Sequence, residues 1–114
     1  MKKLIAFAAA VLTSNSAFAG YGIATVDELH VDAEGYVEFG TTVTLPGTCN
    51  WFIDTFRFNG TSAAGKNMLA MLMTAKVAGI PLTIWYNDST TPGTNQGNGC
   101  TQATMAVPTA LGIR

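Results

Sequence analysis

Residues 62–86 read SAAGKNMLAMLMTAKVAGIPLTIWY, and this stretch decides the fold class. Most residues after Ser62 are good helix formers, and Ser62 itself is a suitable N-terminal cap, so a helix is predicted over Ala63–Ala78. Gly79 favours the left-handed conformation that ends a helix. The run Leu82–Tyr86 is rich in β-forming residues and is predicted to be a strand.

The sequence on both sides of this stretch is dominated by strand patterns. The further predicted strands are Tyr21–Val31, Tyr36–Leu45, Trp51–Phe58 and Thr104–Ile113. The order strand, strand, strand, helix, strand, strand predicts a mainly β domain with one helix, namely a five-stranded OB-fold-like antiparallel barrel, closed or partly closed. A ferredoxin-like sandwich is the alternative, but it needs a helix between its first two strands, and the turn Asp32–Gly35 is too short for one.

Two residues interrupt the strand patterns. Asp54 shares a face with three phenylalanines in the third strand, which predicts either a bulge or a buried, partnered carboxylate at this position. Pro108 in the last strand lacks a backbone N–H, so that strand must lie at an edge or contain a bulge.

Residues 1–19 have the features of a bacterial secretory signal peptide. Lys2 and Lys3 precede an uncharged apolar run at Leu4–Leu12, and Ala17-Phe18-Ala19 matches a cleavage site. We therefore predict an exported protein, periplasmic or extracellular in a Gram-negative bacterium, with a single domain at residues 20–114. The apolar run is short for a membrane span, so no membrane insertion is predicted; a short N-terminal membrane anchor is the alternative.

Cys49 and Cys100 are the two cysteines of the chain, and both follow the predicted leader. An even number of cysteines in a small exported domain predicts a disulfide between them. Two free thiols or part of a metal site are the alternatives, although two ligands cannot complete a structural zinc site. No metal or cofactor is predicted.

The charge balance excludes several classes of partner. Without Lys2 and Lys3 the chain carries four basic residues against seven acidic ones, a net charge of −3. Nucleic acids and anionic membrane surfaces need clustered Lys and Arg, so neither is predicted as a partner. Neutral polar ligands such as sugars, or other copies of the chain, fit this composition better.

The predicted helix has two apolar faces. One is expected to cover the core and comprises Ala64, Met68, Met71, Leu72 and Ala75. A surface helix of a small monomer should be polar on its other side. Because apolar residues recur there, we predict a homo-oligomer interface formed by Leu69, Ala70, Met73 and Val77.

No set of residues predicts an enzyme. His30 is the one histidine and is expected to be an exposed structural residue at a strand end. Ser62 and Ser89 lie in no nucleophile motif. Four acidic residues near the first turn lack the spacing of a calcium loop and are expected to be solvated; they are Asp27, Glu28, Asp32 and Glu34.

Aromatic residues with polar neighbours are the best candidates for a ligand site. Sugars stack on such rings and hydrogen-bond to nearby amides and carboxylates, so a lectin-like site is predicted from Tyr21, Trp51, Trp85, Asn87 and Asp88. Packing of these rings in the core or in a subunit interface is the alternative. Alternation along a strand implies that Trp85 and Tyr86 cannot both point inward.

Residues 65–86 resemble the helix, helix exit and fourth strand of small exported OB-fold proteins. That group includes the pentameric B subunits of subtilase cytotoxin and of pertussis-like toxins, and the single cysteine pair and the leader are similar. The resemblance implies a ring of copies that binds glycans. Tyr21–Val31 contains no serine, so the family's sialic-acid contact near the first strand has no counterpart. The predicted function is a toxin B-subunit-like binding protein; the alternative is a protein-interaction or inhibitory module of the bacterial envelope.

Overall fold

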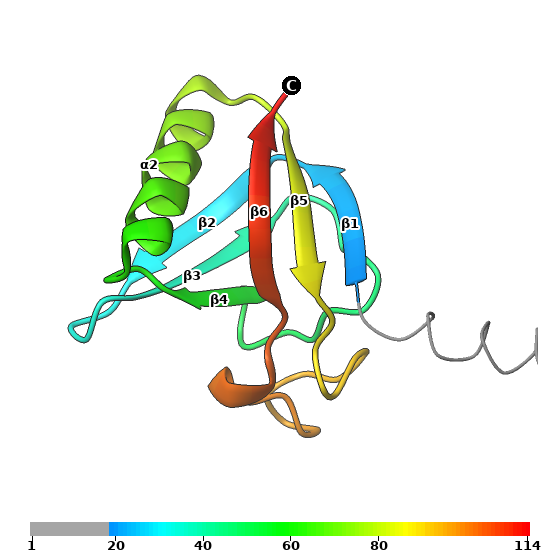
Figure 1. The fold of residues 1–114 in the computed structure, drawn as a ribbon. Helices are drawn as coiled ribbons and strands as arrows, with labels where there is room; N and C mark the ends of the chain where they lie inside the picture. The colour runs from blue at the N-terminus through cyan, green and yellow to red at the C-terminus, as the bar shows by residue number, and fades with distance from the viewer. Residues whose placement is uncertain (1–18) are drawn as a thin grey trace, which may run out of the picture.

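The structure is a computed structural model that describes residues 19–114 (Figure 1). The predicted leader lies outside the described residues except for Ala19, which begins the first strand. No helix in the described part is long and apolar enough to cross a membrane. In chain order the elements are β1 (Ala19–Ala24), β2 (Val26–Val31), β3 (Tyr36–Thr41), β4 (Phe56–Asn59), α2 (Ala63–Ala78), β5 (Leu82–Asn87), the 3₁₀ turn η1 (Gln102–Thr104) and β6 (Val107–Ile113).

The strands form two antiparallel three-stranded sheets. Sheet A has the order β1-β5-β6, and sheet B has the order β2-β3-β4. In Figure 1 the strands of sheet A stand upright and those of sheet B run across behind them, with α2 at one side. The prediction of a mainly β domain with one helix is confirmed for the described residues, but the five-stranded closed barrel is wrong: six strands form two separate sheets.

The additional strand arises at Thr25, which divides the predicted strand Tyr21–Val31 into β1 and β2. Before this residue the chain pairs with β5, and after it the chain pairs with β3. A register shift between Val26 and Glu28 accompanies the change of partner, as expected where a strand bends from one sheet to another. The two sheets also meet at an isolated parallel bridge between Phe56 and Ala106.

The hydrophobic core lies between the two sheets and α2. Phe39 and Phe56 stack with their ring centroids 4.9 Å apart, and Tyr86 meets Phe56 edge to face at 5.0 Å. Leu72 and Ala75 of α2 are fully buried against this cluster. One hydrophobic cluster therefore contains residues from both sheets and from α2.

The predicted bounds of the helix are confirmed. The Ser62 hydroxyl accepts a hydrogen bond from the Gly65 N–H at 3.0 Å, and Gly79 ends the helix with a φ of 68°. A Cβ at Gly65 would overlap the Asn59 carbonyl oxygen, so the first turn of the helix packs tightly on the end of β4. The prediction that Ala64 faces the core is wrong, because Gly65 takes the buried position and Ala64 is exposed.

The prediction of a strand over Trp51–Phe58 is wrong for the residues before Phe56. Trp51 and Asp54 close a turn, and β4 begins only at Phe56. Of the two alternatives for Asp54, the buried and partnered carboxylate is confirmed. The expectation for Pro108 is also confirmed, because β6 is an edge strand and its register with β5 shifts beside this residue.

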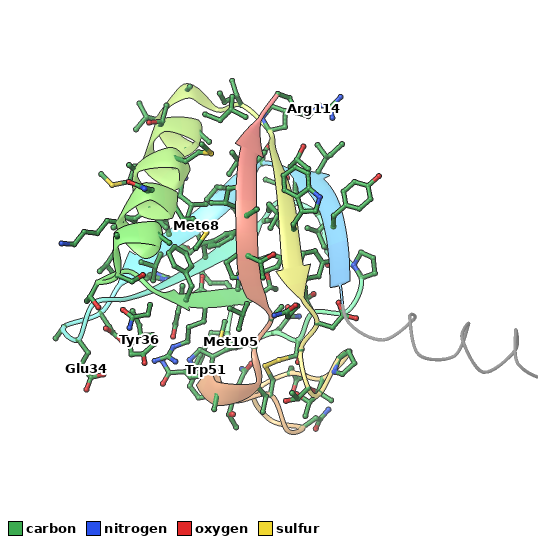
Figure 2. The ribbon with its side chains drawn as sticks, in the orientation of Figure 1. Glu34, Tyr36, Trp51, Met68, Met105 and Arg114 are labelled. Atoms are coloured by element: carbon green, nitrogen blue, oxygen red, sulfur yellow. A yellow bond between two sulfur atoms is a disulfide. The ribbon has the colours of Figure 1, made fainter. Side chains whose placement is uncertain are left out.

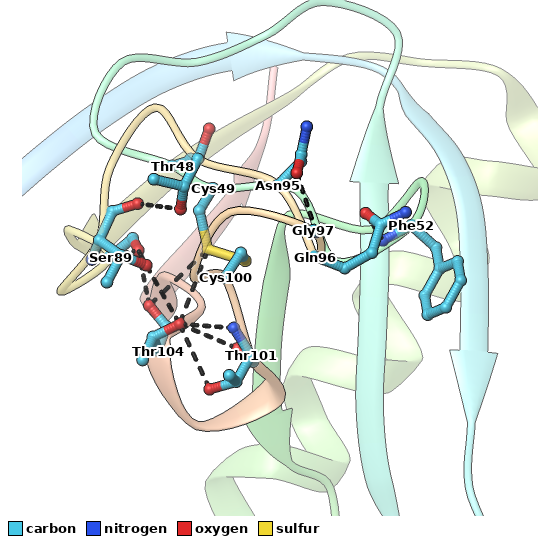
Figure 3. The surroundings of a disulfide bond; sticks show 12 residues. Thr48, Cys49, Phe52, Ser89, Asn95, Gln96, Gly97, Cys100, Thr101 and Thr104 are labelled. Carbon is cyan, nitrogen blue, oxygen red and sulfur yellow. Dashed lines mark hydrogen bonds between the residues drawn. A yellow bond between two sulfur atoms is a disulfide. The ribbon is translucent and has the colours of Figure 1, made fainter.

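The predicted disulfide is confirmed, with the Cys49 and Cys100 Cα atoms 5.8 Å apart (Figure 3). It anchors the long segment between β5 and β6. The Thr104 carbonyl accepts hydrogen bonds from the Ser89 hydroxyl at 2.6 Å and from the Thr90 N–H at 3.1 Å. The segment is therefore tied at both ends despite having little regular structure.

Candidate binding face

Strand β5 turns alternate side chains to opposite sides of sheet A. Leu82, Ile84 and Tyr86 are buried in the core, whereas Trp85 and Asn87 are exposed on the other side. This confirms that Trp85 and Tyr86 do not both point inward. The outward side of sheet A is therefore accessible to a ligand.

Tyr21 and Trp85 form an exposed aromatic pair on this side. They lie opposite each other in the pairing of β1 with β5, with ring centroids 6.5 Å apart and planes inclined by 23°. Tyr21 is 64% exposed and Trp85 is 44% exposed. We call six residues on the outward side of sheet A the aromatic face, namely Tyr21, Ile23, Thr83, Trp85, Asn87 and Val107. Ala110 and Gly112 of β6 lie on the same side, opposite Trp85 and Thr83.

Buried contacts hold the strands of this face in place. The Tyr86 hydroxyl donates to the Pro46 carbonyl, and a Cβ at Gly20 would lie only 2.8 Å from the Tyr86 ring. Burial, with a smaller effect of the Asp88 charge, raises the pKa of Tyr86, so the phenol remains a donor. A Cβ at Gly112 would lie 3.5 Å from the Trp85 indole, so that ring extends over β6 beside a residue without a side chain.

Not all predicted ligand residues belong to the aromatic face. Tyr21, Trp85 and Asn87 come together on it, and the exposed Asp88 follows directly after β5. Trp51 lies elsewhere, beside Met105 and the disulfide, as Figure 2 shows. The pairing of β1 with β5 brings Tyr21 to Trp85, whereas Trp51 belongs to a turn away from sheet A. The predicted ligand residues therefore lie at two separate positions on the domain.

The outward side of α2 carries the predicted oligomer interface. Leu69 is half-buried against the core, whereas Ala70, Met73 and Val77 are exposed, Val77 to 89%. Met73, Thr74, Val77 and Ala78 line a shallow, mostly apolar depression. Three of the four predicted residues are therefore available for contact with another molecule.

The outward side of sheet B has a different character, because charged side chains lie in register across its strands. His30 on β2 lies opposite Glu38 on β3, which lies opposite Arg57 on β4. The Arg57 Nε donates to Glu38 Oε2 at 3.0 Å, and Gln102 Nε2 donates to the same oxygen at 2.7 Å. The Arg57 guanidinium also lies 3.8 Å from the centre of the Tyr36 ring.

Asp54 and His30 form a pair that sequence reasoning missed. His30 Nδ1 lies 2.8 Å from Asp54 Oδ2, and Asp54 is only 3% exposed. The hydrogen bond to Asp54 raises the pKa of His30, although burial opposes it. Burial raises the pKa of Asp54, against the effect of His30. The interrupted pattern at Asp54 and the lone histidine were the two signals of a pair, but they lie 24 residues apart.

This pair does not form a complete catalytic set in the described residues. His30 Nε2 lies 3.7 Å from Glu28 Oε1, and no hydroxyl or thiol between residues 19 and 114 is hydrogen-bonded to the ring. Within the same range no group of three or more His, Cys, Asp or Glu side chains is arranged to hold a metal ion.

Comparison with protein-family models, curated proteins and solved structures finds no match to this chain.

Proposed function

We propose that this chain is an exported, non-enzymatic binding protein that recognises neutral glycans through the aromatic face. The exposed Tyr21–Trp85 pair, with Asn87 on the same face, is the observation that carries the proposal. The apolar faces of sugar rings stack on aromatic side chains, while an amide hydrogen-bonds to their hydroxyl groups. A ligand bound to a flat face needs such large rings, because few other contacts are available to it.

The charge distribution favours neutral over acidic sugars. The six residues of the aromatic face include no cation, and Arg57 is already paired with Glu38 on sheet B. Lys66 and Lys76 belong to α2, and Arg114 follows the end of β6, beyond the six residues of the face. A sialic-acid carboxylate would therefore lack a charged partner among the residues of this face, in keeping with the missing serine in the first strands.

The likeness to toxin B subunits extends this proposal to the architecture and the assembly. One residue separates β1 from β2, and a parallel bridge joins β4 to the chain before β6, so we regard the two sheets as an opened, OB-like arrangement. The exposed Met73 and Val77 support a homo-oligomer formed through α2. Several copies would present several aromatic faces and raise the avidity for a multivalent glycan surface.

A glycan array that includes neutral and sialylated oligosaccharides tests the proposal, with titration calorimetry on the ligands it identifies. We expect binding to neutral glycans, and we expect Trp85→Ala to weaken it by about tenfold or more through loss of stacking. Phe52→Ala is the control, because Phe52 is an exposed aromatic residue away from this face. No binding across the array, or equal losses in both variants, would refute the proposal.

A protein partner is the second candidate, because Val77 and Met73 expose apolar surface on α2. The native mass of the purified protein, measured by light scattering, separates the two uses of this surface. An oligomer that Val77→Glu converts to monomers would assign α2 to self-association. A monomeric wild-type protein that retains an envelope protein in pull-down, and loses it in Val77→Glu, would assign α2 to a different partner.

A further inference from the structure

The turn formed by residues 51–54 covers the outward side of sheet B. Two backbone hydrogen bonds close it, from Trp51 N–H to the Asp54 carbonyl at 2.9 Å and from Asp54 N–H to the Trp51 carbonyl at 3.0 Å. It lies so close to β3 that a Cβ at Gly40 would stand 2.3 Å from the Ile53 carbonyl oxygen. We call this segment the 51–54 turn.

The 51–54 turn contains a strained residue and exposes apolar side chains, so its own two hydrogen bonds are opposed by unfavourable terms. Phe52 has a φ of 56°, a region that a bulky side chain rarely occupies, and both Phe52 and Ile53 expose their apolar side chains. Contacts with the rest of the domain must therefore hold the turn closed. One of them is the hydrogen bond from Phe52 N–H to Gln96 Oε1 at 3.1 Å, which Figure 3 shows.

The side chain of Asp54 makes a second hydrogen-bonded contact, in addition to the packing of Trp51 against the disulfide and Met105. Its Oδ2 lies 2.8 Å from His30 Nδ1, and because a carboxylate only accepts, this nitrogen carries the proton. Its Oδ1 is buried without a hydrogen-bond partner. A buried carboxylate with one oxygen unpaired is costly unless a positive charge compensates it. Neutral His30 can keep the hydrogen bond from Nδ1–H but supplies no charge, so the contact is strongest when His30 carries its second proton, on Nε2.

The surrounding charges do not replace that compensation. Glu28 on β2 lies 3.7 Å from the other His30 nitrogen, and Glu38 on β3 is opposite His30. Both are acidic, and the nearest cation on this side of sheet B, Arg57 on β4, is already paired with Glu38. Protonated His30 is therefore the direct counter-charge of Asp54, and its loss leaves acidic groups around a buried carboxylate.

We propose that the His30–Asp54 contact is a pH-sensitive latch, which keeps the 51–54 turn closed over Gly40 while His30 is protonated and lets it open when His30 releases its proton to solvent. Opening moves Phe52 and Ile53 away from sheet B and uncovers the backbone of β3 at Gly40. The latch is independent of glycan binding, since it lies on the other sheet.

The direction of the pKa shifts agrees with this latch. The pKa of His30 lies above its ordinary 6.5 and that of Asp54 above its ordinary 3.8, so the folded protein holds both protons more tightly than the unfolded chain. The contribution of His30 to stability is complete below pH 6.5 and is lost as the pH rises through the folded-state pKa. Closure is therefore favoured in mildly acidic solution and weakened in alkaline solution.

Hydrogen exchange of the full-length protein across pH 5–9 tests the latch, after correction for intrinsic exchange rates. The amide of Thr55 reports on closure, because it donates to the Phe39 carbonyl at 3.0 Å directly after the turn. We expect its protection to fall by about tenfold as His30 deprotonates, while core amides of β3 and β5 remain unchanged. Trp51 fluorescence in a Trp85→Phe background should change over the same pH range.

Two variants and a control decide the outcome. Asp54→Asn and His30→Gln should each abolish the pH dependence at Thr55, and Glu34→Gln, which changes an exposed carboxylate in another turn, should preserve it. His30→Gln alters a half-exposed side chain, so it decides the question if Asp54→Asn does not fold. A flat pH profile in the wild type, or an unchanged profile in His30→Gln, would overturn the proposal.

Discussion

The two sheets present opposite kinds of surface to solvent. The aromatic face of sheet A leaves Tyr21 and Trp85 exposed and carries no charged side chain among its six residues. The outward side of sheet B carries a row of charges, and the 51–54 turn covers part of it. Both sheets bury their inward side chains in one core, so the contrast arises entirely on their outward sides.

The contrast indicates a division of roles. An exposed aromatic pair gains little for folding because it remains in water, so it is a good candidate for ligand contact. Polar groups that are already paired, such as Glu38 with Arg57 and Asp54 with His30, contribute instead to the position of loops and strands. We therefore expect mutations on the outward side of sheet A to affect binding and those on the outward side of sheet B to affect stability.

Removal of the disulfide, which joins the chain before the 51–54 turn to the segment between β5 and β6, should have the largest effect. Replacing Cys49 and Cys100 together by Ser opens a loop with a sequence separation of 51, for which chain entropy predicts a loss of about 4 kcal/mol in the free energy of unfolding. Urea denaturation measures the loss. A change below about 1 kcal/mol would show that the hydrogen bonds around Thr104 hold this end of the domain without the disulfide.

Two glycine substitutions contrast the sheets directly. A Cβ at Gly40 would stand 2.3 Å from a backbone oxygen of the 51–54 turn, so Gly40→Ala should lower the free energy of unfolding by about 2–3 kcal/mol. Gly112→Ala on sheet A makes an ordinary 3.5 Å contact with Trp85 and should cost less than about 1 kcal/mol. Equal thermal stabilities of the two variants would show that the turn does not press on β3.

Two neighbouring aromatic residues distinguish the two sides of β5. Tyr86→Phe leaves the Pro46 carbonyl without its donor inside the domain, and should cost about 1 kcal/mol. Trp85→Phe keeps an aromatic ring on the exposed side and should change stability by less than about 0.5 kcal/mol while it weakens glycan binding. A larger stability loss in Trp85→Phe than in Tyr86→Phe would argue that Trp85 has a structural role.

The smallest effect is expected at the ion pair of sheet B. A double-mutant cycle with Arg57→Met and Glu38→Gln should give a coupling energy of about 0.5–1 kcal/mol, since both side chains are largely but not fully buried. The coupling should shrink as salt is added. A coupling energy of zero would show that Gln102 and Tyr36 hold these side chains equally well without the pair.

Sequence reasoning succeeded where short-range physics is sufficient. The cap at Ser62 and the left-handed Gly79 define both ends of α2 because each acts within one turn of the helix. Alternation along β5 predicted the opposite directions of Trp85 and Tyr86 for the same reason. It failed at residues 51–55, where a strand-like composition forms a turn, because contacts with β3 and Gln96 outweigh local propensity.

By itself, the sequence determined the helix, the mainly β class and the pairing of Cys49 with Cys100, because caps, alternation and the presence of only two cysteines leave few alternatives. Only the tertiary structure decided the change of sheet at Thr25, the contact of Tyr21 with Trp85 and the pairing of His30 with Asp54. Each of these depends on the register between segments far apart in the chain. Register follows from how the whole core packs, and no local pattern specifies it.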